Sequence, residues 1–181
     1  MKIEKRWVVS FIIISIVALM GLFWDSSADV QQMQNFLTEK DIVGSDVAWI
    51  LSAAGLVLLM TPGLSFFYGG MVGKKNVIST MLQSFIALGV ISILWVVVGF
   101  SLCFGDSIGV QINGETYGII GDPRTFPFFN GVGVLPHKEM ASTIPFVLFA
   151  LFQMKFAVIT PALITGSFAE RVRFISYLVF I

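Results

Sequence analysis

Charged residues are scarce in this chain. Asp, Glu, Lys and Arg make up only 12% of its 181 residues, and 56% are hydrophobic, whereas about 25% of residues are charged in soluble domains. The 11 basic and 11 acidic residues cancel, so the chain lacks the positive surplus that marks nucleic-acid-binding proteins. This composition excludes an ordinary water-soluble core, sets nucleic acid aside as a partner, and favours the lipid bilayer.

Cysteine and histidine, which provide most thiol and metal chemistry, occur once each. Cys103 lies in an apolar run, which favours a buried, unreactive thiol without a disulfide inside the chain. His137 follows Pro136 in a polar stretch, where we expect a solvated side chain. The sequence also offers no nucleophile–base pair, phosphate loop or metal-ligand spacing. We therefore expect no enzymatic activity, no cofactor and no metal site.

Two long runs, residues 47–67 and 77–105, contain no charged residue. A helix rises 1.5 Å per residue, so about 20 such residues cross the roughly 30 Å hydrocarbon core of a bilayer. We therefore predict membrane-spanning helices near residues 46–68 and 77–104. The connection between them is short and contains Lys74 and Lys75, so the two helices must form an antiparallel hairpin.

A third span is predicted from about residue 141 to 169, with Pro145 and Pro161 inside it. A fourth begins at residue 174 and has eight residues in the given sequence, a length of only about 12 Å, so we expect it to be incomplete. Before the third span, residues 105–139 carry a turn signal at Asn113-Gly114 and prolines that discourage helix. A strand pair around residues 110–120 fits this pattern.

The N-terminus has the layout of a signal peptide. Basic residues precede the apolar residues 7–24, and small residues follow at 26–28, which predicts a signal peptide at residues 1–28. An uncleaved membrane anchor is the alternative, because the apolar run is long. In both cases residues 29–45 form an extracytoplasmic lead-in, and the mature N-terminus lies outside. This topology places Lys74, Lys75, Arg171 and Arg173 on the inner side, as the positive-inside rule requires.

One group of residues in the third span could carry chemistry. Phe152 and Phe156 are four residues apart, so their rings are expected to stack on one helix face and could form a surface for a small cation. Simple packing against lipid or core is the alternative. Gln153 and Lys155 lie beside them. Tyr68, near the inner end of the first span, is either an interfacial residue or part of a polar path.

Several short motifs occur together in one order. They are DVAW at residues 46–49, TPG at 61–63, FFYGG at 66–70, KNV at 75–77, WVVVGFS at 95–101, FG at 104–105, FQ at 152–153, FA at 156–157 and GSFAER at 166–171. In this order the chain, over residues 44–181, resembles the N-terminal third of the ammonium transporter family. The resemblance implies an all-α polytopic membrane protein, the N-terminal part of an eleven-helix fold of two inverted repeats.

The resemblance also implies a function. It points to ammonium or ammonia as the substrate, a homotrimer with one pore per subunit, and the plasma (inner) membrane of a bacterium or archaeon. Phe152 and Phe156 match the family's Phe gate, with Gln153 beside it, and Tyr68 matches a tyrosine on the proton path. The family's vestibule Trp, buried Asp and twin pore histidines fall beyond Ile181.

Lys155 departs from the neutral residue that the family usually has at this position. Its charge is costly at the centre of a bilayer unless its stem carries the ammonium group to water. Snorkelling is one interpretation, and modification of the gate is the other. Three functions therefore remain for the chain: part of an ammonium transporter, an ammonium sensor on the same scaffold, or a truncated product without transport activity.

Overall fold

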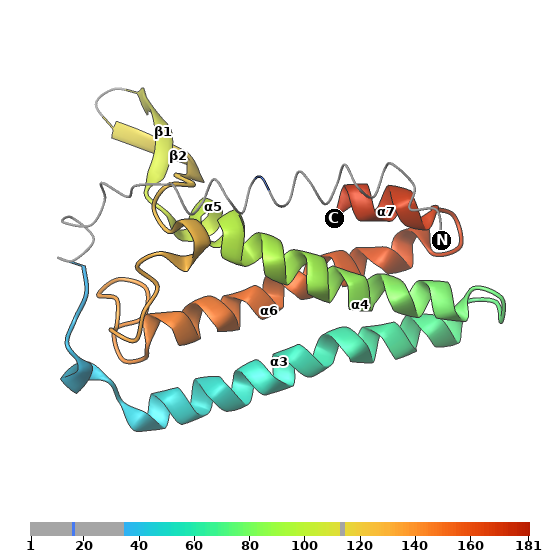
Figure 1. Ribbon diagram of the computed structural model, residues 1–181, viewed down its shortest axis with the longest axis horizontal. Coiled ribbons are helices and arrows are strands. Elements are labelled where there is room, and N and C mark those ends of the chain that lie inside the picture. The colour runs from blue at the N-terminus through green and yellow to red at the C-terminus, as the bar shows by residue number, and fades with distance from the viewer. Residues whose placement is uncertain (1–15, 17–34, 113–114) are drawn as a thin grey trace.

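Three long helices lie side by side in the computed structural model, which describes residues 16, 35–112 and 115–181 (Figure 1). They are α3 (Gly44–Met71), α4 (Val77–Leu94) and α6 (Phe146–Ile164). The helices at 44–71, 77–104 and 146–168 are long and apolar enough to cross a membrane. The signal peptide expected at residues 1–28 and the turn expected at Asn113-Gly114 lie outside the described residues.

The predicted hairpin of α3 and α4 is confirmed. The two helices pack against each other and are joined by the turn at residues 72–76, which contains Lys74 and Lys75 (Figure 1). Small residues allow the close approach. A Cβ on Gly69 would lie 2.8 Å from Cγ of Met81, and the Ser65 hydroxyl donates a hydrogen bond to the Met81 carbonyl at 3.1 Å.

A π-helical turn, η2 (Trp95–Gly99), joins α4 to α5 (Phe100–Phe104). Its signature is the backbone N–H of Phe100, which donates to the carbonyl of Trp95 five residues earlier. The indole N–H of Trp95 donates to the Ala150 carbonyl at 3.1 Å. The π-helical turn therefore fixes α4 against α6. Cys103 in α5 is exposed, so the expectation of a buried thiol was wrong for the described chain.

The third helix starts later than predicted, at Phe146 and not near Ala141. Pro145 is extended (ψ 134°), and Ala141 pairs with His137 through two backbone hydrogen bonds, which keeps this stretch out of the helix. The helix continues through Pro161 and tightens into η4 (Thr165–Phe168), and α7 (Phe174–Phe180) follows. A one-turn helix, η1 (Glu39–Asp41), precedes α3.

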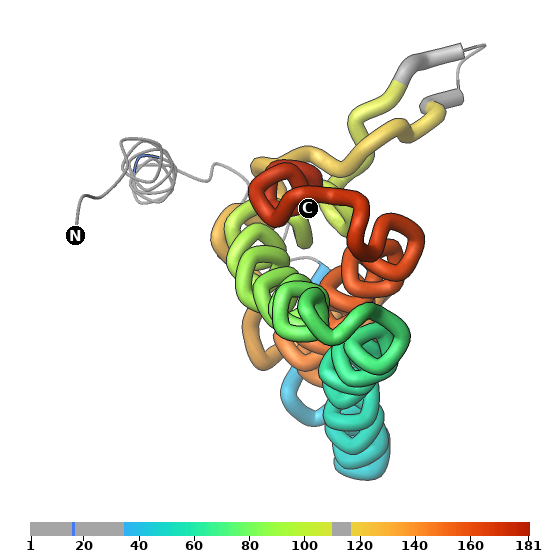
Figure 2. The backbone as a smooth tube through the Cα atoms, turned by 90° about the vertical axis from the view of Figure 1, so that its right-hand side faces the viewer, coloured from blue at the N-terminus to red at the C-terminus, as the bar shows by residue number. Residues whose placement is uncertain are grey.

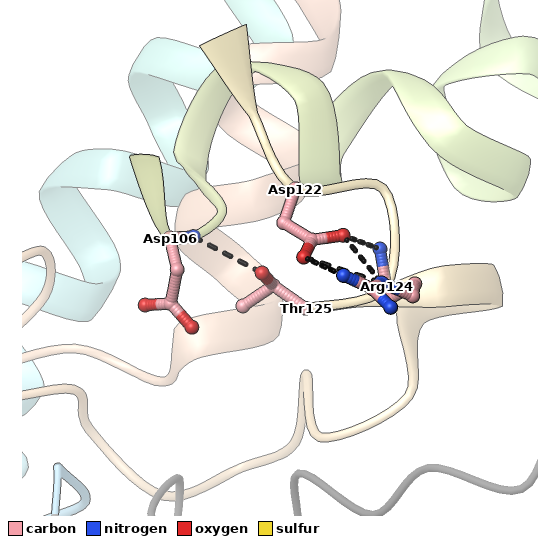
Figure 3. Close-up of polar contacts among 4 residues, drawn as sticks. All are labelled: Asp106, Asp122, Arg124 and Thr125. Carbon is pink, nitrogen blue, oxygen red and sulfur yellow. Dashed lines mark hydrogen bonds and ion pairs between the residues drawn. The ribbon is translucent and has the colours of Figure 1, made fainter. Parts of the chain in front are cut away.

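The predicted strand pair is present and slightly longer than expected, as β1 (Ser107–Ile112) and β2 (Glu115–Gly121), paired antiparallel. It projects away from the helices (Figure 2). Figure 3 shows the contacts at its base: the Asp106 amide donates to the Thr125 hydroxyl at 3.0 Å, and Arg124 pairs with Asp122 at 2.9 Å. The hydrogen bonds from Arg124 lower the pKa of Asp122. This network attaches the strand pair to the end of α5.

The end of the bundle beside the strand pair, called the loop end here, has an aromatic core around Phe100. This ring has no solvent exposure, and five rings surround it at centroid distances of 5.2 to 5.9 Å. The surrounding rings are those of Trp95, Phe104, Phe126, Phe129 and Phe146. Phe129 is the last residue of η3 (Pro127–Phe129) and has a positive φ of 61°.

The opposite end, called the turn end, is built around the turns at residues 72–76 and 169–173 (Figure 1). The interfaces toward it are more polar: Thr61, Ser65, Thr80, Ser84 and Thr165 are all buried. The Tyr177 hydroxyl of α7 donates to the Gln83 carbonyl of α4 at 3.2 Å. Aromatic packing thus dominates the core of the loop end, whereas polar side chains occupy the helix interfaces toward the turn end.

Candidate functional site

A groove of about 410 Å³ opens at the loop end. One wall is the first turns of α3, the other is α6, and the extended residues 140–144 close its edge. Its lining consists of Asp46, Trp49, Ile50, Met140, Ala141, Ser142, Thr143, Ile144, Phe149, Phe152 and Gln153. The backbone N–H of Val43 donates to the Thr143 carbonyl at 2.9 Å, which fixes the start of α3 against this edge.

The groove combines one carboxylate with aromatic rings and an amide. Asp46 lies in the first turn of α3, and Trp49 lies one turn further along with 75% of its surface exposed. Phe152 and Gln153 line the same groove from α6. A carboxylate attracts a cation, ring faces bind it through their quadrupole, and amide oxygen accepts its N–H groups. This set of groups suits a small cation that carries hydrogen-bond donors.

The two phenylalanines of α6 are in contact, as predicted, but they do not stack. Their ring centroids are 5.1 Å apart and the ring planes meet at 84°. This edge-to-face arrangement places the positive edge of one ring against the negative face of the other, which is favoured over a sandwich. The Phe156 side chain is 42% exposed. The expected stacked pair is therefore an edge-to-face pair, with a free ring surface on Phe156.

Lys155 is half-buried and lies between these phenylalanines in the sequence. Residues three and four positions away share its side of the helix, and among them Val158 and Ile159 are buried. Among the residues that the structure describes, Lys155 has no hydrogen-bond or ion-pair partner. Its ammonium group therefore has no counter-ion among the described residues.

Tyr68 belongs to α3 and contacts α6 at the end far from the groove. Its hydroxyl donates to the Leu163 carbonyl at 3.0 Å, and a Cβ on Gly166 would lie 2.6 Å from its ring. Leu163 is about 15 Å along the helix from Gln153, from the rise of 1.5 Å per residue. The structure therefore places Phe152 and Gln153 in the groove, Phe156 near the middle of α6 and Tyr68 at the turn end.

His137 corrects another expectation, because its ring is buried and only 4% exposed. It stacks on Phe146 at 4.9 Å and meets the edge of Phe36 at 5.4 Å. Its Nδ1 accepts from the backbone N–H groups of Glu139 and Met140, both at 3.4 Å. Burial lowers the pKa of His137, although the Glu139 carboxylate opposes this. The histidine is a structural part of the groove's rim.

Asp46 and Trp49 were not predicted as site residues. The signal was present, since Asp46 is the acid in the first turn of an otherwise uncharged helix and Trp49 follows three positions later, on the same face. Their position opposite α6 could not be predicted, because it depends on how the helices pack. No cluster of three or more His, Cys, Asp or Glu suited to a metal ion occurs in the part of the chain that the structure describes.

The fold and the groove define a class: a polytopic helical membrane protein with an aromatic, carboxylate-bearing groove at one end of its bundle. Residues 48–181 match the sequence profile of the Ammonium Transporter Family. The chain belongs to this family.

Individual relatives agree. The chain is 42% identical over 149 residues to the ammonium transporter of Mycobacterium tuberculosis (strain ATCC 25618 / H37Rv), covering 76% of this chain and 30% of the relative. It is 44% identical over 135 residues to the ammonium transporter of Bacillus subtilis (strain 168), covering 75% and 31%. A putative ammonium transporter of Methanothermobacter thermautotrophicus is 42% identical over 137 residues, with coverage of 75% and 31%. The chain thus spans about 30% of the length of these relatives.

Proposed function

We propose that this chain is the N-terminal part of a membrane transporter for ammonium or ammonia. The observation that carries the proposal is the groove, in which Asp46, Trp49, Phe152 and Gln153 meet in a chain of the Ammonium Transporter Family. These groups recognise the features of ammonium, a small charged donor of hydrogen bonds.

Phe152 lines the groove and Phe156 follows it one turn along α6, and in this proposal the pair acts as the gate. A dehydrated ammonium ion is costly in an apolar passage, whereas neutral ammonia is not. The ion is recruited in the groove and gives its proton to the Asp46 carboxylate, which lines the groove together with Phe152, and the neutral molecule passes the rings. Gln153 helps to orient the ion by accepting one of its N–H groups. At the turn end, Tyr68 lines the path by which the proton continues.

The proposal includes an orientation. The loop end lies outside a bacterial or archaeal plasma membrane, after an N-terminal signal peptide. The turn end, with Lys74, Lys75, Arg171 and Arg173, lies in the cytoplasm, as the positive-inside rule favours. The full-length protein is a homotrimer in the lipid bilayer. Native mass spectrometry of the full-length protein measures the trimer directly, and a monomer or dimer would contradict it.

The transport proposal is tested with purified full-length protein in liposomes. An inward ammonium gradient is applied, and the charge transfer and the internal pH are recorded. We expect an ammonium-dependent signal that Phe156→Leu reduces by on the order of tenfold, since the substitution removes one ring of the phenylalanine pair. Phe66→Leu is the matched control, because Phe66 is exposed on α3 away from the groove. Wild-type liposomes without any ammonium-dependent signal would refute transport.

Lys155 favours a second candidate function, ammonium sensing on the same scaffold. Its charge, which has no counter-ion among the described residues, repels a cation at the gate and leaves binding in the groove intact. Each 1.4 kcal/mol of repulsion at the gate slows passage by about tenfold. Lys155 is therefore proposed as a gate modifier.

Substitution of Lys155 separates the two functions. In full-length protein, Lys155→Met is expected to raise ammonium flux by about tenfold, and Lys155→Arg, which keeps the charge, is expected to leave it unchanged. Equal flux in the wild type and in Lys155→Met would remove the role of the lysine. Ammonium binding without flux in the wild type, with flux restored in Lys155→Met, would establish the sensor.

A further inference from the structure

One carboxylate joins the two turns of the turn end. Oε1 of Glu170 accepts a hydrogen bond from the backbone N–H of Gly73 at 2.7 Å and another from the side-chain amide of Asn76 at 3.0 Å. Glu170 follows α6, whereas Gly73 and Asn76 form the turn between α3 and α4. Segments almost a hundred residues apart in the sequence therefore meet at one oxygen atom.

The α3–α4 turn is arranged to present both donors. The Asn76 backbone N–H donates to the Gly73 carbonyl at 2.8 Å, which closes the turn and places both donors on one side. A Cβ at Gly73 would lie 3.2 Å from Oε1 of Glu170, closer than most such contacts. Glycine therefore lets the carboxylate approach this backbone N–H.

Glu170 itself has an unusual backbone conformation. Its φ is 66°, in the left-handed region that residues with a side chain seldom adopt. Such a conformation persists only where surrounding contacts hold it. The Arg171 N–H that donates to the Phe168 carbonyl at 3.0 Å is one such contact, and the two bonds to the carboxylate are the others. The same two bonds lower the pKa of Glu170, with the Asn76 bond the larger cause.

Tyr68 lies between the same two segments. It is near the end of α3, just before the turn that Glu170 binds, and its partners Leu163 and Gly166 lie just before Glu170. The Tyr68 hydrogen bond spans α3 and α6 and is 3.0 Å long. Its length depends on the separation of the two helix ends. The contacts of Glu170 fix that separation five residues after Tyr68 and seven residues after Leu163.

We propose that Glu170 is a positioning residue for Tyr68: its carboxylate clamps the α3–α4 turn to the end of α6 and so holds the Tyr68 hydroxyl against the Leu163 carbonyl. The role in transport rests on the proposed function, in which Tyr68 lines the path at this end. The clamp itself is a property of the fold and can be measured without transport.

The first test measures the clamp in full-length protein by hydrogen exchange of the Gly73 amide. Glu170→Ala removes the acceptor and is expected to speed this exchange by on the order of tenfold. Glu170→Gln keeps an oxygen that can accept both bonds and is expected to retain the protection. Asn76→Ala removes one donor and serves as a milder variant, with an intermediate rate expected. Unchanged exchange at Gly73 in both alanine variants would refute the clamp.

The second test measures the role of the clamp in transport. Glu170→Ala is expected to lower the maximal rate of ammonium uptake by about tenfold with KM within twofold, because groove binding lies at the other end. Glu170→Gln should restore the rate. In a double-mutant cycle with Tyr68→Phe, the combined loss should be no larger than the greater single loss, since both act on one contact. Losses that multiply would overturn the positioning role.

The two tests separate the two proposals. Wild-type protein without ammonium uptake, but with Gly73 protection that Glu170→Ala removes, refutes transport and keeps the clamp. Wild-type uptake that is unaffected by Glu170→Ala keeps transport and refutes the positioning role.

Discussion

The two ends of the bundle are stabilised in different ways. At the loop end, Phe100 has no solvent exposure and packs among five rings. At the turn end, the helices are joined by single hydrogen bonds, from Tyr68 to Leu163 and from Gly73 and Asn76 to Glu170. Ring packing sums many weak contacts, whereas a hydrogen bond depends on the distance and angle of one pair of groups. The two ends are thus expected to respond differently to single substitutions.

The largest expected effect breaks the loop end. Phe100→Ala removes the ring at the centre of the aromatic core, and loss of a fully buried Phe typically lowers the free energy of unfolding by about 3–5 kcal/mol. Thermal unfolding of purified full-length protein measures the loss. Phe66→Ala is the control, because the Phe66 ring is 66% exposed in the described chain. Equal destabilisation by both substitutions would show that the aromatic core does not hold this end.

A smaller effect is expected at the turn end. Gly166→Ala would place a Cβ 2.6 Å from Cε1 of Tyr68, so the ring or η4 must move, at a cost of about 1–3 kcal/mol. Gly63→Ala is a matched control, since a Cβ there meets nothing within 4 Å and alanine favours the helix by up to about 1 kcal/mol. Thermal unfolding measures both. A Gly166→Ala protein as stable as the Gly63→Ala protein would contradict the close contact with Tyr68.

The smallest effect concerns pH at the groove's rim. Burial lowers the pKa of His137 below its ordinary value of 6.5, with Glu139 opposing. His137 therefore takes up a proton at a higher pH when this stretch is unfolded than when it is folded. The contribution of the neutral, buried ring to stability is complete above pH 6.5 and is lost as the pH falls below that value through the pKa of the folded state.

Hydrogen exchange of the Ala141 amide, which donates to the His137 carbonyl at 2.9 Å, measures this effect. After correction for the intrinsic pH dependence, protection at pH 5 should be lower than at pH 7.5 by about two- to tenfold. His137→Gln does not titrate and should show equal protection at both pH values. Equal protection in the wild type would mean that protonation of the ring does not loosen this stretch.

The sequence predicts the parts of this fold that depend on neighbours along the chain. The uncharged runs and the short connection at Lys74 and Lys75 suffice for the helical hairpin, because the length of a run and the length of a turn are local properties. The contact between Phe152 and Phe156 follows from their spacing of four residues. Their relative ring orientation does not, because rotamers depend on packing.

Long-range packing explains what the sequence did not predict. His137 looked like a solvated loop residue, and its burial comes from Phe36 and Phe146, which are distant in the sequence. The groove pairs Asp46 and Trp49 with α6 only after the helices pack. Glu170 and Gly73 are 97 residues apart, so no local pattern indicates their contact. The start of α6 at Phe146 was also not predicted, although Pro145, which precedes it, is a local signal in the sequence.

The π-helical turn at Trp95–Gly99 decides which face of α5 meets the aromatic core. Each residue of an α-helix turns the chain by about 100°, so two side chains five positions apart would point in different directions. Trp95 and Phe100 are five positions apart, and yet their rings meet at 5.9 Å, because a π-helical turn takes up one residue more than an α-helical turn. The turn thus accommodates an extra residue in the chain while the rings on both sides of it still face the same core.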